Sequence, residues 1–342
     1  MDVTSVRMPE PGSLEIIERD IDVGEDEVLV ETARASICDA DLRAWKGMSI
    51  PEDMPDGVFE YPGHEGAGTV VETGRRVTKF KEGDRVMLFG PNNSFSSHFT
   101  APVESLQPAP DEVSMEIASL GEPACVGIYG VFQSGVQPGD DVLVAGLNFQ
   151  GQIAIEGLKK KGASQVIAVD YREPRLEMAE NRGADIVLNT ETDDVPSRIE
   201  EHTRYNAEED ASGHQSGDAG VDVSFHSCGY WNPHQEEYFN LCVANTRDEG
   251  IVASIPDMME PVTVDLHRIH HHGMDIRLPA LMHHGPEFLD RWVPRLMKPI
   301  VTDVIEVESL ITSEYSLSEV DEAMERYSND ESQVKIALDP RE

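Results

Sequence analysis

Apolar and polar residues alternate over short stretches in the chain up to about Pro110. Residues 27–31 and 68–72 show this alternation, and glycine and proline interrupt it at short intervals. A period of two places successive side chains on opposite faces of a strand, and frequent turns join such strands antiparallel. The first part of the chain is therefore predicted to form a barrel-like antiparallel β domain.

A different pattern begins at Asp141, where short and largely apolar runs alternate with segments of helical character. Runs of this kind are typical of parallel strands that are buried on both faces of an α/β sheet. They occupy residues 142–145, 166–169, 185–188, 221–225 and 250–254. Two further helices are predicted beyond the last of these runs, at 286–296 and 317–327. The second part of the chain is therefore predicted to be a doubly wound parallel sheet.

The change of pattern divides the chain into two domains of an α/β protein. Residues 125–282 are assigned to the parallel-sheet domain, and residues 1–124 and 283–342 to the β domain, to which the C-terminus is expected to return. Residues 200–220, rich in Glu, Asp, Ser and Gly, are expected to form an acidic, solvated loop inserted in the second domain.

The charge balance is strongly acidic. Among 342 residues, 65 are Asp or Glu and 27 are Lys or Arg, which gives a formal net charge of −38. This charge repels phosphate backbones and anionic lipid, so nucleic acid and membrane surfaces are excluded as partners. Self-repulsion strains a compact chain at low salt, whereas molar salt shortens the Debye length to ~3 Å. We therefore expect a halophilic surface, the alternative being an acidic enzyme without such adaptation.

No apolar stretch approaches the ~20 residues of a membrane helix, and the N-terminus lacks an apolar signal region. The four cysteines are widely spaced and form no disulfide framework. These features predict a soluble, cytoplasmic protein.

A glycine-rich turn follows the first apolar run of the second domain. A strand, such a turn and the start of a helix place backbone N–H groups against a dinucleotide pyrophosphate. Asn148 replaces the middle glycine of the G-x-G-x-x-G fingerprint, and asparagine tolerates the positive φ that we expect there. A plain strand-to-helix turn is the alternative. The expected cofactor-binding residues of this turn are Gly146, Asn148, Phe149, Gln150 and Gly151.

Asp170 ends the next apolar run, where a carboxylate would accept hydrogen bonds from the adenosine ribose of the cofactor. Because a carboxylate also repels a 2′-phosphate, NAD is the preferred cofactor. Arg172 and Arg175 lie nearby in the sequence and keep NADP as the alternative. The alternative is that Asp170 is an ordinary turn residue without a role in cofactor binding.

Three segments resemble the zinc-containing alcohol dehydrogenases. Residues 63–77 match the G-H-E-x2-G-x5-G-x2-V signature of that family position for position. Residues 36–41 resemble its G-I-C-G-S-D segment, and residues 80–86 resemble its F-x-x-G-D-R-V turn. With the dinucleotide fingerprint in the same order, the resemblance covers essentially the whole chain. The chain is thus similar to the medium-chain dehydrogenase/reductase superfamily, and Glu122-Pro123 makes it most similar to the sorbitol (polyol) dehydrogenase-like branch.

This resemblance implies a GroES-like β-barrel catalytic domain and a Rossmann cofactor domain. It also implies catalytic roles for four residues: Cys38 and His64 as zinc ligands, with Glu65 and Glu122 binding zinc directly or through its water. A thiolate, an imidazole and a carboxylate leave one zinc position open to substrate, as catalytic sites require. Zinc there would stabilise the alkoxide from which hydride passes to the nicotinamide. Taken singly, Cys38 would more often be a buried apolar residue, and His64 a hydrogen-bonded polar residue beside a turn.

The chain departs from the family pattern in two places. Residues 87–98, where many members carry a four-cysteine zinc lobe, contain no cysteine, so one catalytic zinc and no structural zinc is expected. Ala40 and Arg43 occupy the usual positions of the proton relay, but alanine carries no transferable proton and arginine is permanently charged. Glu65, Glu122 or a zinc-bound water is expected to take the proton instead.

The function implied is oxidation of a secondary hydroxyl of a polyol, sugar or cyclitol with NAD(P). The alternatives are a dehydrogenase of simple alcohols or threonine-like substrates, a ketone reductase working in reverse, and a non-catalytic nucleotide-binding protein of the same fold. The family resemblance also implies a homodimer or homotetramer. A group of histidines is expected to lie on the surface or in an interface and to bind no metal: His267, His270, His271, His272, His283 and His284.

Overall fold

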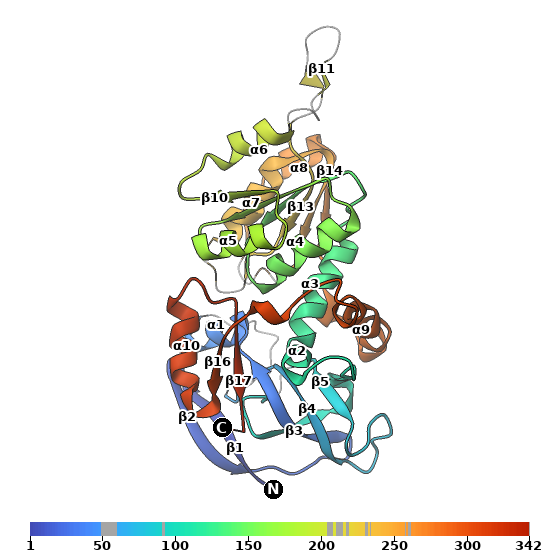
Figure 1. Cartoon of the computed structure of the whole chain (residues 1–342), viewed down its shortest axis with the longest axis vertical. Helices are drawn as coiled ribbons and strands as arrows, with labels where there is room; N and C mark the ends of the chain where they lie inside the picture. Colours follow the sequence, from blue (N-terminus) through green and yellow to red (C-terminus); the bar gives the residue numbers. More distant parts are fainter. Residues whose placement is uncertain are drawn as a thin grey trace. The chain divides into compact units, whose positions relative to one another are not determined.

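A computed structural model describes residues 1–48, 60–90, 93–203, 208–209, 215–216, 219–229, 232, 234–256, 258 and 261–341. The chain divides into two compact units (Figure 1). The first consists of Met1–Cys125 and Met282–Glu342, and the second of Val126–Leu281. The C-terminal segment belongs to the first unit.

The first unit is built on a seven-stranded sheet in the order β16-β17-β3-β4-β5-β7, with β6 paired to β3. All of these pairs are antiparallel except β16 with β17, which is parallel. The strands of this sheet are β3 (Glu27–Ser36), β4 (Glu65–Thr73), β5 (Arg85–Leu88), β6 (His98–Pro102), β7 (Leu106–Pro108), β16 (Ile311–Ser316) and β17 (Lys335–Asp339).

Other elements of the first unit lie around this sheet. Strands β1 (Asp2–Glu10) and β2 (Ser13–Asp20) form a separate antiparallel hairpin. The helices are α1 (Asp39–Trp45), α2 (Met115–Ser119), α3 (Gly121–Gln133, which continues into the second unit), α9 (Pro286–Val301) and α10 (Val320–Asn329). The helix predicted at 317–327 starts as a short 3₁₀ turn, Leu317–Glu319, and continues as the α-helix α10.

The second unit contains a six-stranded, wholly parallel sheet in the order β10-β9-β8-β13-β14-β15. Its strands are β8 (Asp141–Ala145), β9 (Gln165–Asp170), β10 (Ile186–Asn189), β13 (Val221–His226), β14 (Thr246–Ser254) and β15 (Asp275–Arg277). Its helices are α4 (Phe149–Lys161), α5 (Glu173–Asn181), α6 (Val195–Thr203), α7 (Gln235–Asn245) and α8 (Leu266–His271). The strand order reverses between β8 and β13, and ligands of such sheets bind outside the carboxyl ends of the strands at this point.

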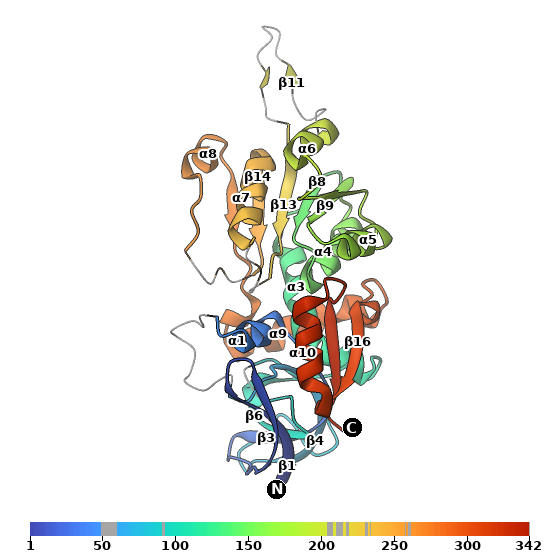
Figure 2. The same cartoon turned by 90° about the vertical axis from the view of Figure 1, so that its left-hand side faces the viewer.

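Alternate residues of the central strands pack into two separate cores, which explains why the strand sequences are apolar throughout. Val142 and Val144 of β8 join residues of α4 and α5 in one core, whereas Leu143 and Ala145 join residues of α6 and α7 in the other. Figure 2 shows α4 and α5 on one side of this sheet and α7 on the other.

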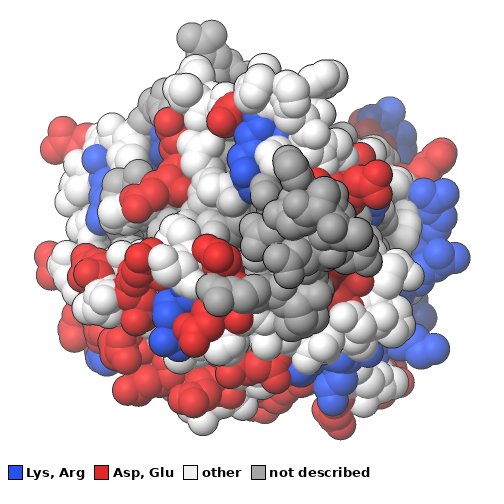
Figure 3. Space-filling view, turned by 90° about the horizontal axis from the view of Figure 1, so that it is seen from above, with Lys and Arg blue, Asp and Glu red and all other residues white. Residues whose placement is uncertain are grey.

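The region predicted as an acidic loop begins with the end of α6. It also contains a two-stranded ribbon of β11 (Glu208–Glu209) and β12 (Gln215–Ser216), and most of its remaining positions lie outside the described residues. None of the described helices is long and apolar enough to span a membrane. Acidic side chains are spread over much of the face drawn in Figure 3, while many of the basic ones gather near one edge.

Candidate functional site

Three potential metal ligands meet in the first unit. The ligand atoms of Cys38, His64 and Glu65 all lie within 4.8 Å of one another, and this is the one group of three such ligands found among the described residues. The pairing of β3 with β4 brings these ligand atoms together, because Ser36 at the end of β3 pairs with Glu65 at the start of β4. Cys38 follows β3 and His64 precedes β4, so antiparallel pairing brings the two ligands together.

The surroundings of these potential ligands are largely buried and strongly charged. Cys38 and Glu65 are buried, and His64 is half-buried. Burial, followed by the nearby Glu65 carboxylate, raises the pKa of the Cys38 thiol to about 11. A divalent cation reverses this effect, because a coordinating thiol is deprotonated outright. One sulfur, one imidazole nitrogen and one carboxylate form a donor set that suits catalytic zinc.

Asp41 contacts the segments that carry Cys38 and His64. Its Oδ2 accepts a hydrogen bond from the backbone N–H of Cys38 at 3.0 Å, and its Oδ1 accepts one from the N–H of Gly63 at 3.1 Å. The same Oδ1 lies 3.7 Å from Nδ1 of His64. Such a carboxylate fixes the orientation of a ligating histidine and raises its basicity.

Asp41 escaped the sequence analysis, although its position offers a signal. It lies at the third position of α1, after Cys38 at the N-cap, and this is the spacing of a capping box.

Lys335 of β17 supports the third ligand. Its Nζ lies 2.6 Å from both carboxylate oxygens of Glu65 and donates a third hydrogen bond to the carbonyl of Ile37 at 3.1 Å. Ser36 Oγ also donates to Glu65. Although burial opposes its charge, the Glu65 carboxylate raises the pKa of Lys335. Lys335 was also missed, and no local pattern could have identified it, because the contact spans most of the chain.

Glu122 lies near this group but outside the 4.8 Å cluster. It occupies the second position of α3 and is buried. Burial raises the pKa of its carboxyl to about 7, against the opposing effect of His64. Ala40 and Arg43 both lie on α1, and Arg43 is buried.

The glycine-rich turn of the second unit depends on two of its glycines. Gly146 has a φ of +91°, and a Cβ there would lie 2.7 Å from the backbone nitrogen of Cys228. A Cβ on Gly151 would lie 2.2 Å from the carbonyl oxygen of Gly146. Only glycine fits these two positions.

The expectation that Asn148 adopts a positive φ is wrong. Asn148 has a φ of −70° and a ψ of −172°, and it is the N-cap of α4. Its Oδ1 accepts hydrogen bonds from the backbone N–H of Gly151 at 3.0 Å and from Ser227 Oγ at 2.6 Å. The residue is asparagine because its side chain caps the helix, and a capping residue takes extended backbone angles.

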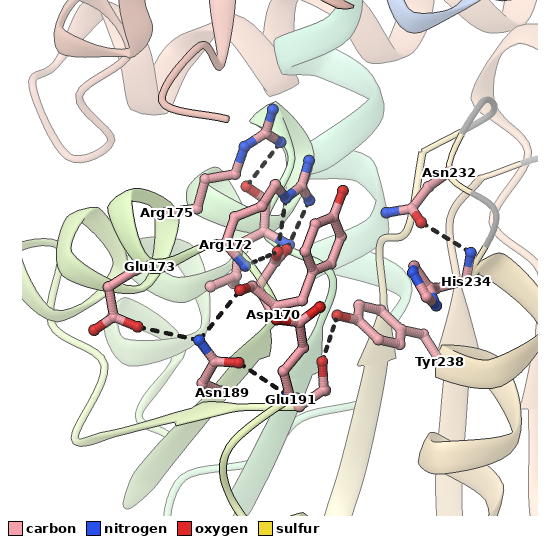
Figure 4. A network of polar contacts seen from close by, with 12 residues as sticks. Asp170, Arg172, Glu173, Arg175, Asn189, Glu191, Asn232, His234 and Tyr238 are labelled. Carbon is pink, nitrogen blue, oxygen red and sulfur yellow. Dashed lines mark hydrogen bonds and ion pairs between the residues drawn. The ribbon is translucent and has the colours of Figure 1, made fainter. Parts of the chain in front are cut away.

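Asp170 ends β9 directly beside this turn and is fully buried. It accepts hydrogen bonds from the N–H of Leu147 at 2.7 Å and from the N–H of Arg172 at 3.0 Å. The guanidinium of Arg172 donates two more, each at 2.7 Å (Figure 4). Although burial opposes ionisation, Arg172 and then Arg175 hold the pKa of Asp170 below its usual value. The expected ribose-binding carboxylate is therefore engaged by the protein itself.

The remaining expected site residues lie close to the same turn. Phe149 and Gln150 form the first two positions of α4. Arg175 of α5 is buried, and its Nη1 lies 3.4 Å from the carbonyl oxygen of Leu147.

The histidines noted in the sequence are dispersed over both units. The rings of His267 and His271 lie 4.0 Å apart on α8, whereas His284 stacks on Phe288 at 4.0 Å. His272 pairs with Asp248. Among the described residues, these histidines form no group of three potential metal ligands.

Two family models match the chain. The alcohol dehydrogenase GroES-like domain matches residues 24–111, and the zinc-binding dehydrogenase domain matches residues 151–289. The uncharacterized zinc-type alcohol dehydrogenase-like protein YdjJ of Escherichia coli is 30% identical over 64% of this chain and 68% of its own. Sorbitol dehydrogenase of Bacillus subtilis is 26% identical over 89% of this chain and 87% of its own.

Solved structures share the whole fold. The 2R,3R-butanediol dehydrogenase of Bacillus subtilis superposes with a TM-score of 0.78 at 24% identity, covering 99% of both chains. Benzyl alcohol dehydrogenase of Acinetobacter calcoaceticus does so with a TM-score of 0.82 at 21% identity, again over 99% of both chains. The predicted pairing of a GroES-like domain with a Rossmann-like parallel sheet is confirmed.

The chain belongs to the zinc-type alcohol dehydrogenase family of the medium-chain dehydrogenase/reductase superfamily. It is an oxidoreductase, as its sorbitol-dehydrogenase-like sequence features predict.

Proposed function

We propose that this protein is a zinc-dependent dehydrogenase that oxidises a secondary hydroxyl of a polyol, sugar or cyclitol with NAD(P). The observation that carries the proposal is the group of Cys38, His64 and Glu65, of which the first and last are buried, and whose ligand atoms lie within 4.8 Å of one another. These three residues would hold the metal and leave a position for substrate. Bound zinc would acidify the substrate hydroxyl and thereby favour hydride loss to the nicotinamide.

The protein's own residues organise this site in two ways. Asp41 holds the backbone at Cys38 and Gly63 and faces His64, which sets the position of the imidazole. Lys335 balances the negative charge of Glu65. Without Lys335 the buried Glu65 carboxylate would carry an unpaired negative charge.

Glu122 is the proposed proton acceptor. Ala40 and Arg43 supply no relay, and both oxygens of Glu65 already accept hydrogen bonds from Lys335. We expect the Glu122→Gln variant to lose most of its turnover while retaining zinc, and the exposed Glu112→Gln variant to serve as its matched control. Unchanged turnover of Glu122→Gln would reject this role.

The polyol class is supported by Glu122-Pro123, which resembles the Glu-Pro of polyol dehydrogenases at a position where classical alcohol dehydrogenases carry a cysteine ligand. It is also consistent with the named activities of relatives, which include sorbitol and (R,R)-butanediol dehydrogenases. Simple alcohols and threonine-like substrates form the second candidate class. The net charge of −38 supports activity in a cytoplasm of high salt concentration.

Assembly as a homodimer or homotetramer is proposed as well. Strand β15 is one of the two outer strands of the six-stranded sheet. Ile276 within it and Leu278 beside it are 37% and 67% exposed. An open strand edge with exposed apolar residues favours pairing with another chain. Light scattering in molar KCl would test this, and a monomer would contradict it.

The experiment that tests the function measures reduced dinucleotide formation in molar KCl with zinc present. Pooled polyols, sugars and cyclitols are compared with pooled simple alcohols, with either NAD or NADP. Activity on the first pool supports the proposal, whereas activity on simple alcohols alone assigns the second class. The Cys38→Ser variant should be inactive in both, with Cys242→Ala as a buried-cysteine control. Dinucleotide binding without turnover on any pool would indicate a non-catalytic protein.

A further inference from the structure

Choice between NAD and NADP depends on what surrounds the end of β9. Asp170 is the last residue of this strand, and the residue before it, Val169, pairs in register with Ala145 at the end of β8. The N–H of Leu147, in the glycine-rich turn, donates directly to Asp170. A dinucleotide held by this turn would therefore place its adenosine ribose near Asp170.

The carboxylate of Asp170 has no acceptor position left for a ribose. A carboxylate offers about four lone-pair sites, two on each oxygen. Oδ1 accepts from the backbone N–H and from Nε of Arg172, and Oδ2 accepts from Leu147 N–H and from Nη2 of Arg172. The side chain is also 0% exposed. Selection of NAD by ribose hydrogen bonds to Asp170 would require these contacts to break.

Two arginine side chains lie close to Asp170. Arg172 forms a two-pronged ion pair with it, and the Arg172 guanidinium also lies over the Tyr171 ring at 4.8 Å from its centre. Arg175 follows one helical turn later and also lowers the pKa of Asp170 through its charge. The nearest acid in sequence, Glu173, receives a hydrogen bond from the Asn189 side chain (Figure 4).

Two buried arginines against one buried carboxylate are the reverse of the arrangement that rejects a 2′-phosphate. Arg172 and Arg175 are each 4% exposed, so solvent screens their charge little. Guanidinium groups recognise phosphate oxygens with paired, charge-assisted hydrogen bonds.

We propose that Arg172 determines the choice between NADPH and NADH. Its guanidinium binds the Asp170 carboxylate and, together with Arg175, places positive charge beside the ribose position. The protein therefore binds NADPH at least as tightly as NADH. This inference rests on the proposed dehydrogenase function and replaces the NAD preference expected from Asp170 alone.

The test is a binding measurement that requires neither zinc nor substrate. NADPH and NADH are titrated into the full-length chain in molar KCl, and their dissociation constants are obtained from nucleotide fluorescence. Equal or tighter binding of NADPH supports the inference. Tighter binding of NADH than of NADPH overturns it and leaves the dehydrogenase proposal standing. Failure of both nucleotides to bind overturns the inference and the proposed function together.

The Arg172→Gln variant locates the effect. It frees the Asp170 carboxylate and removes one positive charge, so the ratio of NADPH to NADH affinity should fall by about tenfold or more. Arg182→Gln is the matched control, since Arg182 also pairs a mostly buried guanidinium with a carboxylate, that of Glu156, within the same unit. An unchanged ratio in a folded Arg172→Gln variant would contradict the role of Arg172.

A second variant covers the case in which Arg172→Gln does not fold. Asp170→Asn removes the carboxylate charge but keeps an amide that can accept from Leu147. If the Asp170 carboxylate is already bound by Arg172 and not by the ribose, the variant should leave NADH affinity within about threefold of the native value. A loss of NADH affinity beyond that, with NADPH affinity preserved, would show that Asp170 binds the ribose and would overturn the inference.

Discussion

The ammonium nitrogen of Lys335 lies 2.6 Å from both carboxylate oxygens of Glu65, although 270 positions separate the two residues in the sequence. Both side chains are almost completely buried, at 3% and 0% exposure. The pair connects the last strand of the chain to the candidate metal site. Removing one partner would leave an unpaired charge in a region of low dielectric.

We therefore expect Lys335→Met to lower the free energy of unfolding by about 3–5 kcal/mol. Urea unfolding monitored by circular dichroism would measure this. Lys335→Arg keeps the charge and should lose less. The double variant Lys335→Met with Glu65→Gln should recover part of the loss, and a single Lys335→Met variant of native stability would contradict the structural pairing.

Asp41 should control zinc affinity without binding the metal. Asp41→Asn retains a hydrogen-bond acceptor for the backbone but removes the charge that faces His64. Loss of such a supporting carboxylate typically lowers metal affinity by about 10–100-fold. Competition with a coloured chelator measures the affinity, and the exposed Asp111→Asn variant is the control. Equal zinc affinity in Asp41→Asn and Asp111→Asn would argue against this role.

One zinc ion per chain is expected after exhaustive dialysis. Residues 87–98 contain no cysteine, and one three-ligand group is present among the described residues. Elemental analysis would give the stoichiometry, and chelation should abolish turnover, with recovery when zinc is returned. Two tightly bound ions would reveal a second site.

Asn148 should contribute to stability through its cap and to cofactor binding through its neutrality. Asn148→Ala removes the acceptor for Gly151 N–H and Ser227 Oγ and should cost about 1 kcal/mol of unfolding free energy. Asn148→Asp keeps the cap but places a negative charge where the pyrophosphate is proposed to bind. It should remain as stable as the native protein while binding dinucleotides more weakly. Stability and nucleotide titrations that changed in parallel would contradict this separation.

Salt should stabilise the protein by screening repulsion among its acidic groups. The Debye length falls from about 10 Å at 0.1 M salt to about 3 Å at 1 M. With 65 acidic against 27 basic residues, the melting temperature should rise steadily as KCl is added over this range. Sucrose at matched osmolality is the control, because it does not screen charge. A flat response to KCl would refute the salt adaptation.

Local pattern was sufficient for most of the fold. The apolar runs predicted β8, β9, β13 and β14, because a strand buried on both faces of a parallel sheet has few polar positions. The signature around His64 indicated the zinc-type family, since the residues of this motif and of the adjoining turns lie close together in the sequence.

Local pattern failed where a side chain had more than one available role. Asn148 was expected to supply an unusual backbone angle, but it serves as a helix cap, which requires extended backbone angles. Asp170 was expected to face a ribose, yet Arg172, two residues later, turns back and pairs with it. Both outcomes depend on which hydrogen-bond partners the surrounding turn presents.

The sequence by itself determined the two domain types through periodicity, and the resemblance of its motifs to a known family indicated Cys38, His64 and Glu65 as candidate metal ligands. Only the tertiary structure decided that Lys335 neutralises Glu65 and that Asp170 is already paired. Electrostatic interactions depend on distance in space and on burial, and these are set by strand pairing between segments that are remote along the chain.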